Sequence, residues 1–248
     1  MVIDKESPLP IYYQIQESLK EKIKSGELRP GDKIPSEHEL CEQFNVSRMT
    51  IRQAINNLVK ESYLYRKRGI GTFVQQPKVE QRLQGLTSFT EDMEARGLTP
   101  TSILISFEVV ESKKSVADAL AIEEGTPVYR IHRSRLANGE PIALEWAYIP
   151  VTLMPHLTES VVHRSLYNYV EKELGLTLGR ATQTIEAALA TEVEEKWLEV
   201  ESGDPVLIVE QCSYLTENQP LELVKCVYRA DRYKFITNIE RTDNTSPM

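Results

Sequence analysis

Residues 47–60 read SRMTIRQAINNLVK, and they determine how the N-terminal part of the chain folds. Apolar residues recur there at helical spacing, which predicts a helix with one buried and one polar face. Ser47 is a residue type that caps helix N-termini. The polar face carries Arg48 and Arg52 four residues apart, so they lie side by side. Because arginine pairs bidentately with guanine, the sequence predicts a helix that reads the DNA major groove.

The segments on both sides of this helix complete a larger pattern. Residues 11–23 carry an apolar residue at every fourth position, which predicts an amphipathic helix. Ser36 and Glu39 form a capping-box pair that starts a second, short helix. Residues 63–74 read YLYRKRGIGTFV, two short strands around a basic, glycine-bearing tip that can enter a minor groove. Helices in this order, followed by a basic wing, describe a winged helix-turn-helix.

Charge is distributed unevenly along the chain. The 248 residues have a formal net charge of −8, which taken alone argues against nucleic-acid binding because phosphate backbones attract basic surfaces. However, residues 1–76 carry +2, residues 77–248 carry −10, and residues 44–74 carry +5. The basic charge is therefore concentrated on the predicted recognition helix and wing. A merely solvated basic face, or a helical module for protein contacts, is the alternative.

The composition is typical of a globular protein of the cytoplasm. Hydrophobic residues make up 41 % and charged residues 27 % of the chain, so a core can form. No apolar run approaches the ~18 residues that a membrane span needs, and the N-terminal sequence MVIDKESPLP lacks the apolar core of a signal peptide. The three scattered cysteines fit reduced thiols. We expect no membrane contact, and one large domain or two ordinary ones.

The C-terminal part contains an internal repeat. After a polar segment without periodicity, which predicts a linker, the segments that begin at Asp118 and Lys196 align at an offset of 78 residues. Each copy predicts a short helix, a Gly-x-Pro turn and two strands, and Asn138-Gly139 is a favoured hairpin turn. Two such copies predict one antiparallel sheet with pseudo-symmetry and helices packed on it.

Two arginines distinguish the first copy from the second. Arg133 and Arg135 align with Gln211 and Ser213, so the fold tolerates neutral residues at these positions. Arginines two apart on a strand point to the same face of a sheet, and together they can hold a phosphate or carboxylate. The alternative is a pair of arginines on a solvated face.

Further polar residues are candidates for the same site. Ser88 and Ser165 stand where helices are predicted to begin, which exposes free backbone N–H groups, although each can simply be a cap. Glu145 and Glu222 lie in the returning strands of the two copies, and Tyr228 shares a strand face with Glu222. Carboxylates and a phenol beside an anion site suit sugar hydroxyls; surface ion pairs are the alternative.

The sequence contains no catalytic constellation. The four histidines lack metal-ligand spacing, and no nucleophile elbow, P-loop or dinucleotide fingerprint is present. Cys226 has no evident base partner. We therefore expect no catalytic residue, no metal and no cofactor. An enzyme, or a pure dimerisation scaffold, remains the alternative, and a scaffold would not need the paired arginines.

The N-terminal motifs resemble a known family. The strings PGDKIPSE (30–37), VSRMTIRQAI (46–55) and GIGTFV (69–74) resemble the DNA-binding domain of GntR-type bacterial transcription regulators. Two-fold symmetric readers match two-fold half-sites, so we expect a homodimer on palindromic, double-stranded operator DNA. The residues expected at the DNA are Ser36, Ser47, Arg48, Thr50, Arg52, Gln53, Arg68 and Gly69.

The C-terminal motifs resemble the effector domain of the HutC subfamily, whose fold resembles chorismate lyase. The strings are SFTEDMEARG (88–97), RIHRSRLANGEPIALEWAYIP (130–150), SLYNYV (165–170) and PLELVKCVYRADRYKF (220–235). By the family's pattern, the residues around a phosphate would be Ser88, Phe89, Thr90, Arg133, Arg135, Ser165 and Tyr167. Those lining a sugar would be Glu145, Glu222 and Tyr228.

The resemblance also implies an effector class. Within the subfamily the sequence is most similar to repressors of N-acetylglucosamine utilisation, which implies a small phosphorylated sugar such as N-acetylglucosamine 6-phosphate or glucosamine 6-phosphate. Related regulators respond to trehalose phosphate, urocanate or other small acids, and a chorismate-lyase-like enzyme is a remote alternative. We thus expect an α+β chain. Residues 1–75 would form a winged helix-turn-helix, 76–84 a linker, and 85–248 an antiparallel-sheet, chorismate-lyase-like domain of the UTRA type for effector binding and dimerisation.

Overall fold

The computed structural model describes residues 4, 7–67, 69–75, 78–83 and 85–239. The chain divides into two compact units, Met1–Pro77 and Lys78–Met248, and each is described by itself. Within the described residues, no helix is both long and apolar enough to cross a membrane.

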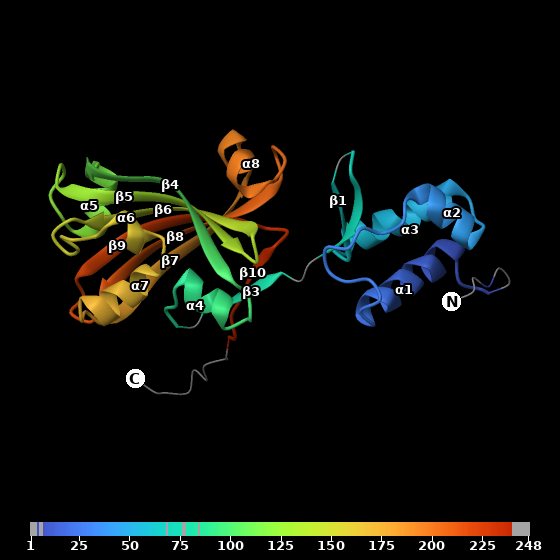
Figure 1. Ribbon diagram of the computed structural model, residues 1–248, viewed down its shortest axis with the longest axis horizontal. Coiled ribbons are helices and arrows are strands. Elements are labelled where there is room, and N and C mark those ends of the chain that lie inside the picture. Colours follow the sequence, from blue (N-terminus) through green and yellow to red (C-terminus); the bar gives the residue numbers. More distant parts are fainter. Residues whose placement is uncertain (1–3, 5–6, 68, 76–77, 84, 240–248) are drawn as a thin grey trace, which may run out of the picture. The chain divides into compact units, whose positions relative to one another are not determined.

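The first unit has three helices followed by a hairpin, as predicted (Figure 1). Its elements are α1 (Ile11–Lys24), α2 (Glu37–Phe44), α3 (Arg48–Lys60), β1 (Leu64–Lys67) and β2 (Gly71–Val74). The apolar faces of the helices meet in one core with the inner ends of both strands. The buried members of this core are Ile15, Leu19, Ile34, Leu40, Ile51, Ala54, Ile55, Leu58, Leu64 and Val74. This arrangement confirms the winged helix-turn-helix.

Local signals in the sequence fix the boundaries of these helices. Ser36 and Glu39 form the predicted capping box at the start of α2, and Ser47 caps α3 by accepting from the backbone N–H of Thr50. Asn45 ends α2 in the left-handed conformation, with φ of 48°. In the hairpin, Gly71 has φ of 147°, and a Cβ atom there would lie 2.5 Å from Cε of Lys33. Glycine is favoured where β2 begins because L side chains rarely adopt this φ, whereas the Lys33 side chain could move away from an added Cβ.

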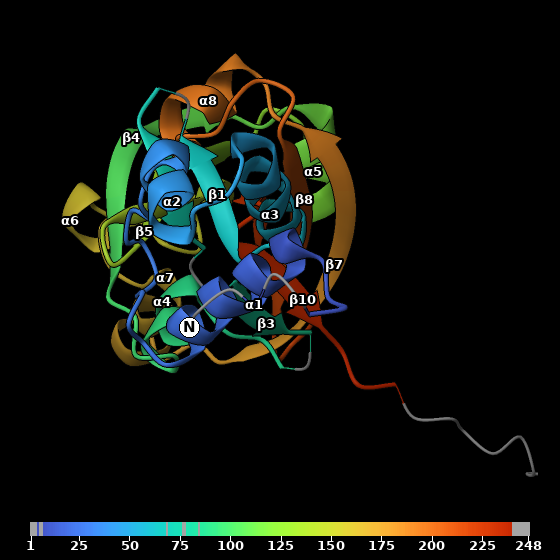
Figure 2. The same ribbon diagram turned by 90° about the vertical axis from the view of Figure 1, so that its right-hand side faces the viewer.

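The second unit is built around a six-stranded antiparallel sheet with the strand order β4-β5-β6-β9-β8-β7. Its elements are β3 (Val79–Arg82), α4 (Phe89–Glu94), β4 (Pro100–Glu111), α5 (Lys114–Leu120), β5 (Pro127–Ala137), β6 (Glu140–Pro150), α6 (Glu159–Val162), α7 (Leu166–Asn168), the π-helical turn η1 (Tyr169–Glu173), β7 (Leu178–Leu189), α8 (Glu192–Leu198), β8 (Pro205–Leu215), β9 (Pro220–Arg229) and β10 (Tyr233–Ile236). Each predicted copy supplies a helix and two paired strands, and β6 pairs with β9 where the copies meet. Strands β4 and β7 form the opposite edges of the sheet (Figure 2). The predicted pseudo-symmetric sheet is confirmed.

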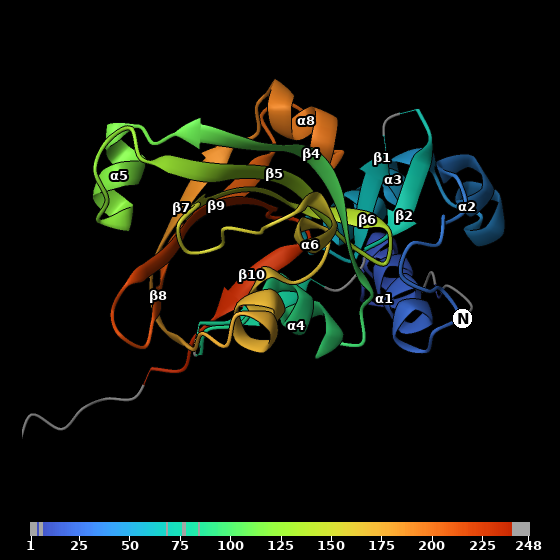
Figure 3. The same ribbon diagram turned by 60° about the vertical axis from the view of Figure 1, so that its left-hand side comes forward.

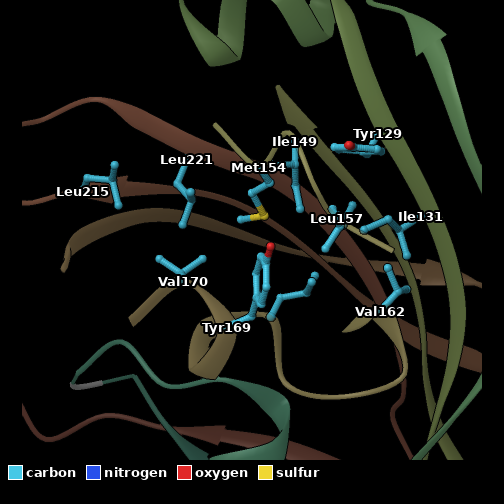
Figure 4. Packing of buried hydrophobic residues seen from close by; sticks show 12 residues of the cluster. Tyr129, Ile131, Ile149, Met154, Leu157, Val162, Tyr169, Val170, Leu215 and Leu221 are labelled. Atoms are coloured by element: carbon cyan, nitrogen blue, oxygen red, sulfur yellow. The ribbon is translucent and has the colours of Figure 1, made fainter. Parts of the chain in front are cut away.

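Helices cover both faces of this sheet (Figure 3). On one face, α5 and α8 each pack over a small apolar cluster. The other face carries α4, α6 and α7, and Figure 4 shows Tyr169 and Val170 directed from the helical side toward Met154 and Leu221. Apolar side chains fill one end of this face, whereas its middle carries polar groups. The cavity described below lies among these polar groups.

Two sequence-based expectations need correction. Residues 79–82, which fell within the predicted linker, form β3 and pair in parallel with β10; residues 76, 77 and 84 of that linker lie outside the described residues. The main-chain partners of β3 are about 150 residues away in sequence, so local polarity gave no sign of this strand. The helix predicted to begin at Ser165 is the short α7 followed by the π-helical turn η1, with Gly175 after it in the left-handed conformation.

Candidate functional site

The polar face of α3 presents a compact basic surface. Arg48, Arg52 and Gln53 are exposed, and Thr50 is half-buried. The Oγ1 atom of Thr50 lies 2.9 Å from Oγ of Ser47, which also caps the helix. These five residues were predicted to face DNA, and the structure places them together over the first two turns of the helix.

The other predicted DNA-facing residues lie around the hairpin and α2. Ser36 is exposed at the N-terminus of α2, where its hydroxyl accepts from the backbone N–H of Glu39 at 3.3 Å. Gly69 lies in the turn between β1 and β2 with φ of 73°. Arg68 lies outside the described residues. Glu37 was not predicted, yet its carboxylate contacts Arg48 on the same surface.

In the second unit, all ten residues predicted to bind an effector line one cavity of about 80 Å3. They come from the sheet strands β5, β6 and β9 and from the N-terminal regions of α4 and α7. Ser88, Phe89 and Thr90 belong to the α4 region, and Ser165 lies next to them, with its Oγ atom donating to Oγ of Ser88 at 3.4 Å. Helices and sheet therefore enclose the polar centre from both sides.

Arg133 is held on the floor of this cavity by a buried ion pair. Its Nε atom donates to Oε1 of Glu145 at 2.8 Å, and Nη1 donates to the carbonyl of Val162. Arg133 and Glu145 stand directly opposite each other on β5 and β6. Burial raises the pKa of the Glu145 carboxyl, but the adjacent Arg133 and Arg135 more than offset this, so its pKa lies below the usual value. Glu145 is therefore ionised.

Arg135 has no such counter-charge. The residue is only 4 % exposed, and its guanidinium donates to Oγ1 of Thr90 at 3.4 Å and lies 4.6 Å from the centre of the Phe89 ring. Its Nε atom is buried without a hydrogen-bond partner, and it joins none of the ion pairs among the described residues. Burial, and next the charge of Arg133, lower the pKa of Arg135 to about 10, so it remains a cation at neutral pH. The cavity thus contains two buried guanidinium groups near one ionised carboxylate, Glu145, which is hydrogen-bonded to Arg133.

A chain of hydrogen bonds lines the opposite side of the cavity. Gln183 donates to Gln211 at 3.0 Å, and Gln211 donates to the hydroxyl of Tyr167 at 3.1 Å. The Tyr167 hydroxyl lies 2.9 Å from Oγ of Ser213, which donates to Glu222 at 3.1 Å. Burial is the main reason that the pKa of Glu222 is raised to about 7 and that the pKa of Tyr167 is well above its usual value. This side therefore offers the neutral donors and acceptors of Gln183, Gln211 and Tyr167, together with a carboxyl that is partly protonated at neutral pH.

Tyr228 closes the end of the cavity. Its ring stacks on Tyr233 with 4.2 Å between the ring centres. The Tyr233 hydroxyl in turn donates to Gln81 of β3 at 2.6 Å. Strand β3 is thereby connected to the cavity wall through two stacked rings.

Several residues of the site were not predicted. The sequence singled out Gln211 and Ser213 only as the neutral residues that align with the two arginines. In the structure both belong to the chain of hydrogen bonds in the cavity wall. The internal repeat could have indicated these residues. Gln211 and Ser213 align with Arg133 and Arg135, and pseudo-symmetry places aligned residues on the same face of the sheet. The other unpredicted lining residues are Gln81, Thr87, Asp92, Leu166, Gln183, Val209, Val224 and Cys226.

The chain is similar to known bacterial regulators along nearly its whole length. The chain is 47 % identical to the HTH-type transcriptional repressor NagR of Bacillus subtilis over 97 % of this chain and 99 % of that protein. It is 32 % identical to the mannosyl-D-glycerate transport/metabolism system repressor MngR of Escherichia coli, over 94 % of this chain and 97 % of that protein. The crystal structure of PhnF from Mycobacterium smegmatis is similar with a TM-score of 0.66 and 30 % identity, covering 92 % of this chain and 100 % of that one.

Family descriptions match both units. Residues 11–74 match the gntR family of bacterial regulatory proteins, and residues 95–234 match the UTRA domain. These matches confirm the expectation of a transcription regulator rather than an enzyme. The chain belongs to the GntR family of bacterial transcription regulators and joins that family's helix-turn-helix to a UTRA domain.

Proposed function

We propose that this regulator is a repressor of amino-sugar utilisation genes that binds palindromic operator DNA as a homodimer. Its effector is a phosphorylated amino sugar, such as N-acetylglucosamine 6-phosphate, which binds in the cavity of the second unit. The similarity to the repressor NagR over nearly the whole chain supports the gene class. The chemistry of the cavity supports the effector class.

The observation that carries the proposal is the buried, unpaired charge of Arg135. Burying a cation without a counter-charge is unfavourable by several kcal/mol, so such a residue is maintained where it meets an anion. Arg133 stands two residues away on the same strand face, and hydroxyls of Thr90 and Ser165 border the same space. Two guanidinium groups and several hydroxyls match the oxygen atoms of a phosphate monoester.

The remainder of the cavity fits a sugar with an amide substituent. Gln183, Gln211 and Tyr167 supply neutral donors and acceptors, and Glu222 is close to its pKa at neutral pH. Ligand pockets commonly measure about 300–1,000 Å3, so the cavity of about 80 Å3 has to widen around a hexose phosphate. Such widening provides the difference between two states that ligand control of DNA binding requires.

Thermal unfolding of the full chain with N-acetylglucosamine 6-phosphate, N-acetylglucosamine and inorganic phosphate tests the effector class. At one hundred times its dissociation constant, the sugar phosphate should stabilise the wild type by about 2.7 kcal/mol. The variant Arg135→Met should lose this response without losing stability, because a buried, unpaired charge is removed. The control Arg130→Met changes the same residue type on β5, where Arg130 pairs with Glu108 at 2.5 Å on the opposite face of the sheet. It should respond like the wild type.

Two outcomes would contradict the proposed effector. Equal stabilisation of Arg135→Met and wild type would show that the anion binds elsewhere. Stabilisation by trehalose phosphate or urocanate, with none by the amino-sugar phosphate, would keep the site but change the effector. In a parallel titration of operator DNA, equal effector affinity of free and DNA-bound protein would exclude control by this ligand.

Operator recognition by α3 gives a separate expected result. Arg52 is exposed on the polar face of this helix, and Arg52→Ala should weaken operator binding by about 1–3 kcal/mol if the side chain contacts a base. Arg29→Ala removes the same charge from an exposed turn outside α3 and the hairpin, and serves as the control. Fluorescence anisotropy with a labelled operator measures both variants. Wild-type affinity of Arg52→Ala would remove Arg52 from the recognition surface.

A further inference from the structure

An acidic residue lies within the basic surface of the DNA-binding unit. Glu37 is the first residue of α2, and its Oε2 atom accepts from Nε of Arg48 at 3.1 Å. Its Oε1 atom lies 4.0 Å from Nη2 of Arg66. Arg48 begins α3 and Arg66 lies on β1, so one carboxylate contacts both elements that are expected to meet DNA.

The exposure of these side chains shows which of them is presented outward. The side chain of Arg48 is 79 % exposed, whereas that of Glu37 is 26 % exposed. The carboxylate thus lies behind the guanidinium group and restricts its orientation. Arg66 has a second anchor, because its Nη2 atom donates to Oδ1 of Asn56 at 2.7 Å. Arg48 is therefore hydrogen-bonded to α2, and Arg66 is hydrogen-bonded to α3.

A carboxylate at this place has two opposing effects on DNA binding. It repels phosphates, which weakens the sequence-independent attraction that neutralised phosphates supply. It also orients arginines, and an arginine held in the correct orientation loses less side-chain entropy when it contacts a base. The first effect acts on every DNA sequence, whereas the second acts only where a base accepts the arginine.

We propose that Glu37 is a positioning residue that raises the ratio of operator binding to non-specific DNA binding by orienting Arg48 and Arg66. The inference rests on DNA contact by α3 and the hairpin, and is independent of the proposed effector. Glu37 also stands in the first turn of α2, where a negative charge favours the helix. Its effect on DNA binding must therefore be separated from its effect on stability.

The test uses the full chain and two duplexes. The first is selected from random DNA by the wild type, and the second is a shuffled sequence of the same composition. For Glu37→Gln, affinity for the shuffled duplex should rise, and the slope of log affinity against log salt should steepen by about 0.9. The ratio of operator affinity to non-specific affinity should fall about tenfold. A tenfold change lies in the lower part of the discrimination between bases that one bidentate arginine contact supplies. Thermal unfolding monitors stability.

Two further variants make the result specific. Glu42→Gln removes the same charge from the same helix, but Glu42 lies 3.6 Å from His38 and contacts no arginine among the described ion pairs; it should leave the affinity ratio unchanged. Glu37→Asp keeps the charge and shortens the reach, so it should lower operator affinity without raising non-specific affinity. An unchanged ratio in Glu37→Gln would overturn the proposal. An equal loss on both duplexes together with a lower melting temperature would do so as well, and would leave Glu37 a helix-stabilising residue only.

Discussion

Replacing Glu145 with glutamine is expected to lower the free energy of unfolding by about 3 kcal/mol, because removal of one partner leaves the other charge of a buried pair uncompensated. Arg133 and Arg135 are 3 % and 4 % exposed, and Glu145 is the carboxylate that binds Arg133. Glutamine preserves the side-chain shape and one oxygen acceptor. The loss of unfolding free energy therefore measures the effect of removing the negative charge and not the effect of a change in side-chain volume. Urea unfolding at neutral pH and low salt measures it.

The same substitution should increase the affinity of the cavity for anions. Glu145 occupies the guanidinium of Arg133 in the structure, so an incoming phosphate competes with an internal carboxylate. Without that competitor, inorganic phosphate should stabilise Glu145→Gln more than it stabilises the wild type.

The control for the stability loss is Glu108→Gln, which breaks the exposed pair with Arg130 and should lower the free energy of unfolding by less than about 1 kcal/mol. Equal unfolding free energies for the two variants would mean that the buried pair contributes no more to stability than the exposed pair.

Replacing Glu222 with glutamine is expected to remove a pH dependence of stability. Burial is the main reason that the pKa of Glu222 is raised to about 7, while Tyr167, Glu145, Ser213 and Arg133 adjust it further. Because the folded state binds the proton more tightly than the unfolded chain, this contribution is complete below about pH 4.5 and is lost as pH rises through 7. The shift corresponds to about 3 kcal/mol.

Unfolding measured from pH 5 to pH 8 tests this expectation. The wild type should lose stability over this interval relative to Glu222→Gln, and the difference should be largest at pH 8. Glutamine can still accept the hydrogen bond from Ser213, which donates to Oε1 of Glu222. Glu210→Gln, an exposed position on the adjacent strand β8, should follow the wild-type profile. Parallel profiles for wild type and Glu222→Gln would show that the carboxyl titrates without linkage to folding.

Local rules predicted the DNA-binding unit almost completely. Caps at Ser36 and Ser47, the left-handed turn at Asn45 and the apolar face of α3 depend on residues that are close in sequence. Within the second unit, the internal repeat predicted the strand pairs and the hairpin turn at Asn138. Alternation along β5 placed Arg133 and Arg135 on one face. Helix starts and strand positions pointed to five further residues of the cavity, and the family resemblance added Phe89, Thr90 and Tyr167.

Contacts between segments that are distant in sequence could not be predicted from local sequence signals. Strand β3 depends on β10 for its main-chain partners, so its short polar sequence indicated only a linker. Alternation along the strand predicted that Arg133 and Arg135 share one face of the sheet. It could not predict that only Arg133 forms an ion pair, because the pair depends on Glu145 of the neighbouring strand β6. Glu37 was not predicted at all, because its contact with Arg66 depends on where the hairpin returns.

The two halves of the pseudo-symmetric sheet contribute different side chains to the cavity. The first copy contributes both cations and one carboxylate, and the second contributes Gln211, Ser213 and Glu222. Because each copy forms its own strand pair, the second copy can change without altering the first. If the proposed phosphate site is correct, a library that varies Gln211 of the second copy and Gln183 of the neighbouring strand β7 should change which sugar phosphate binds without changing the two arginines.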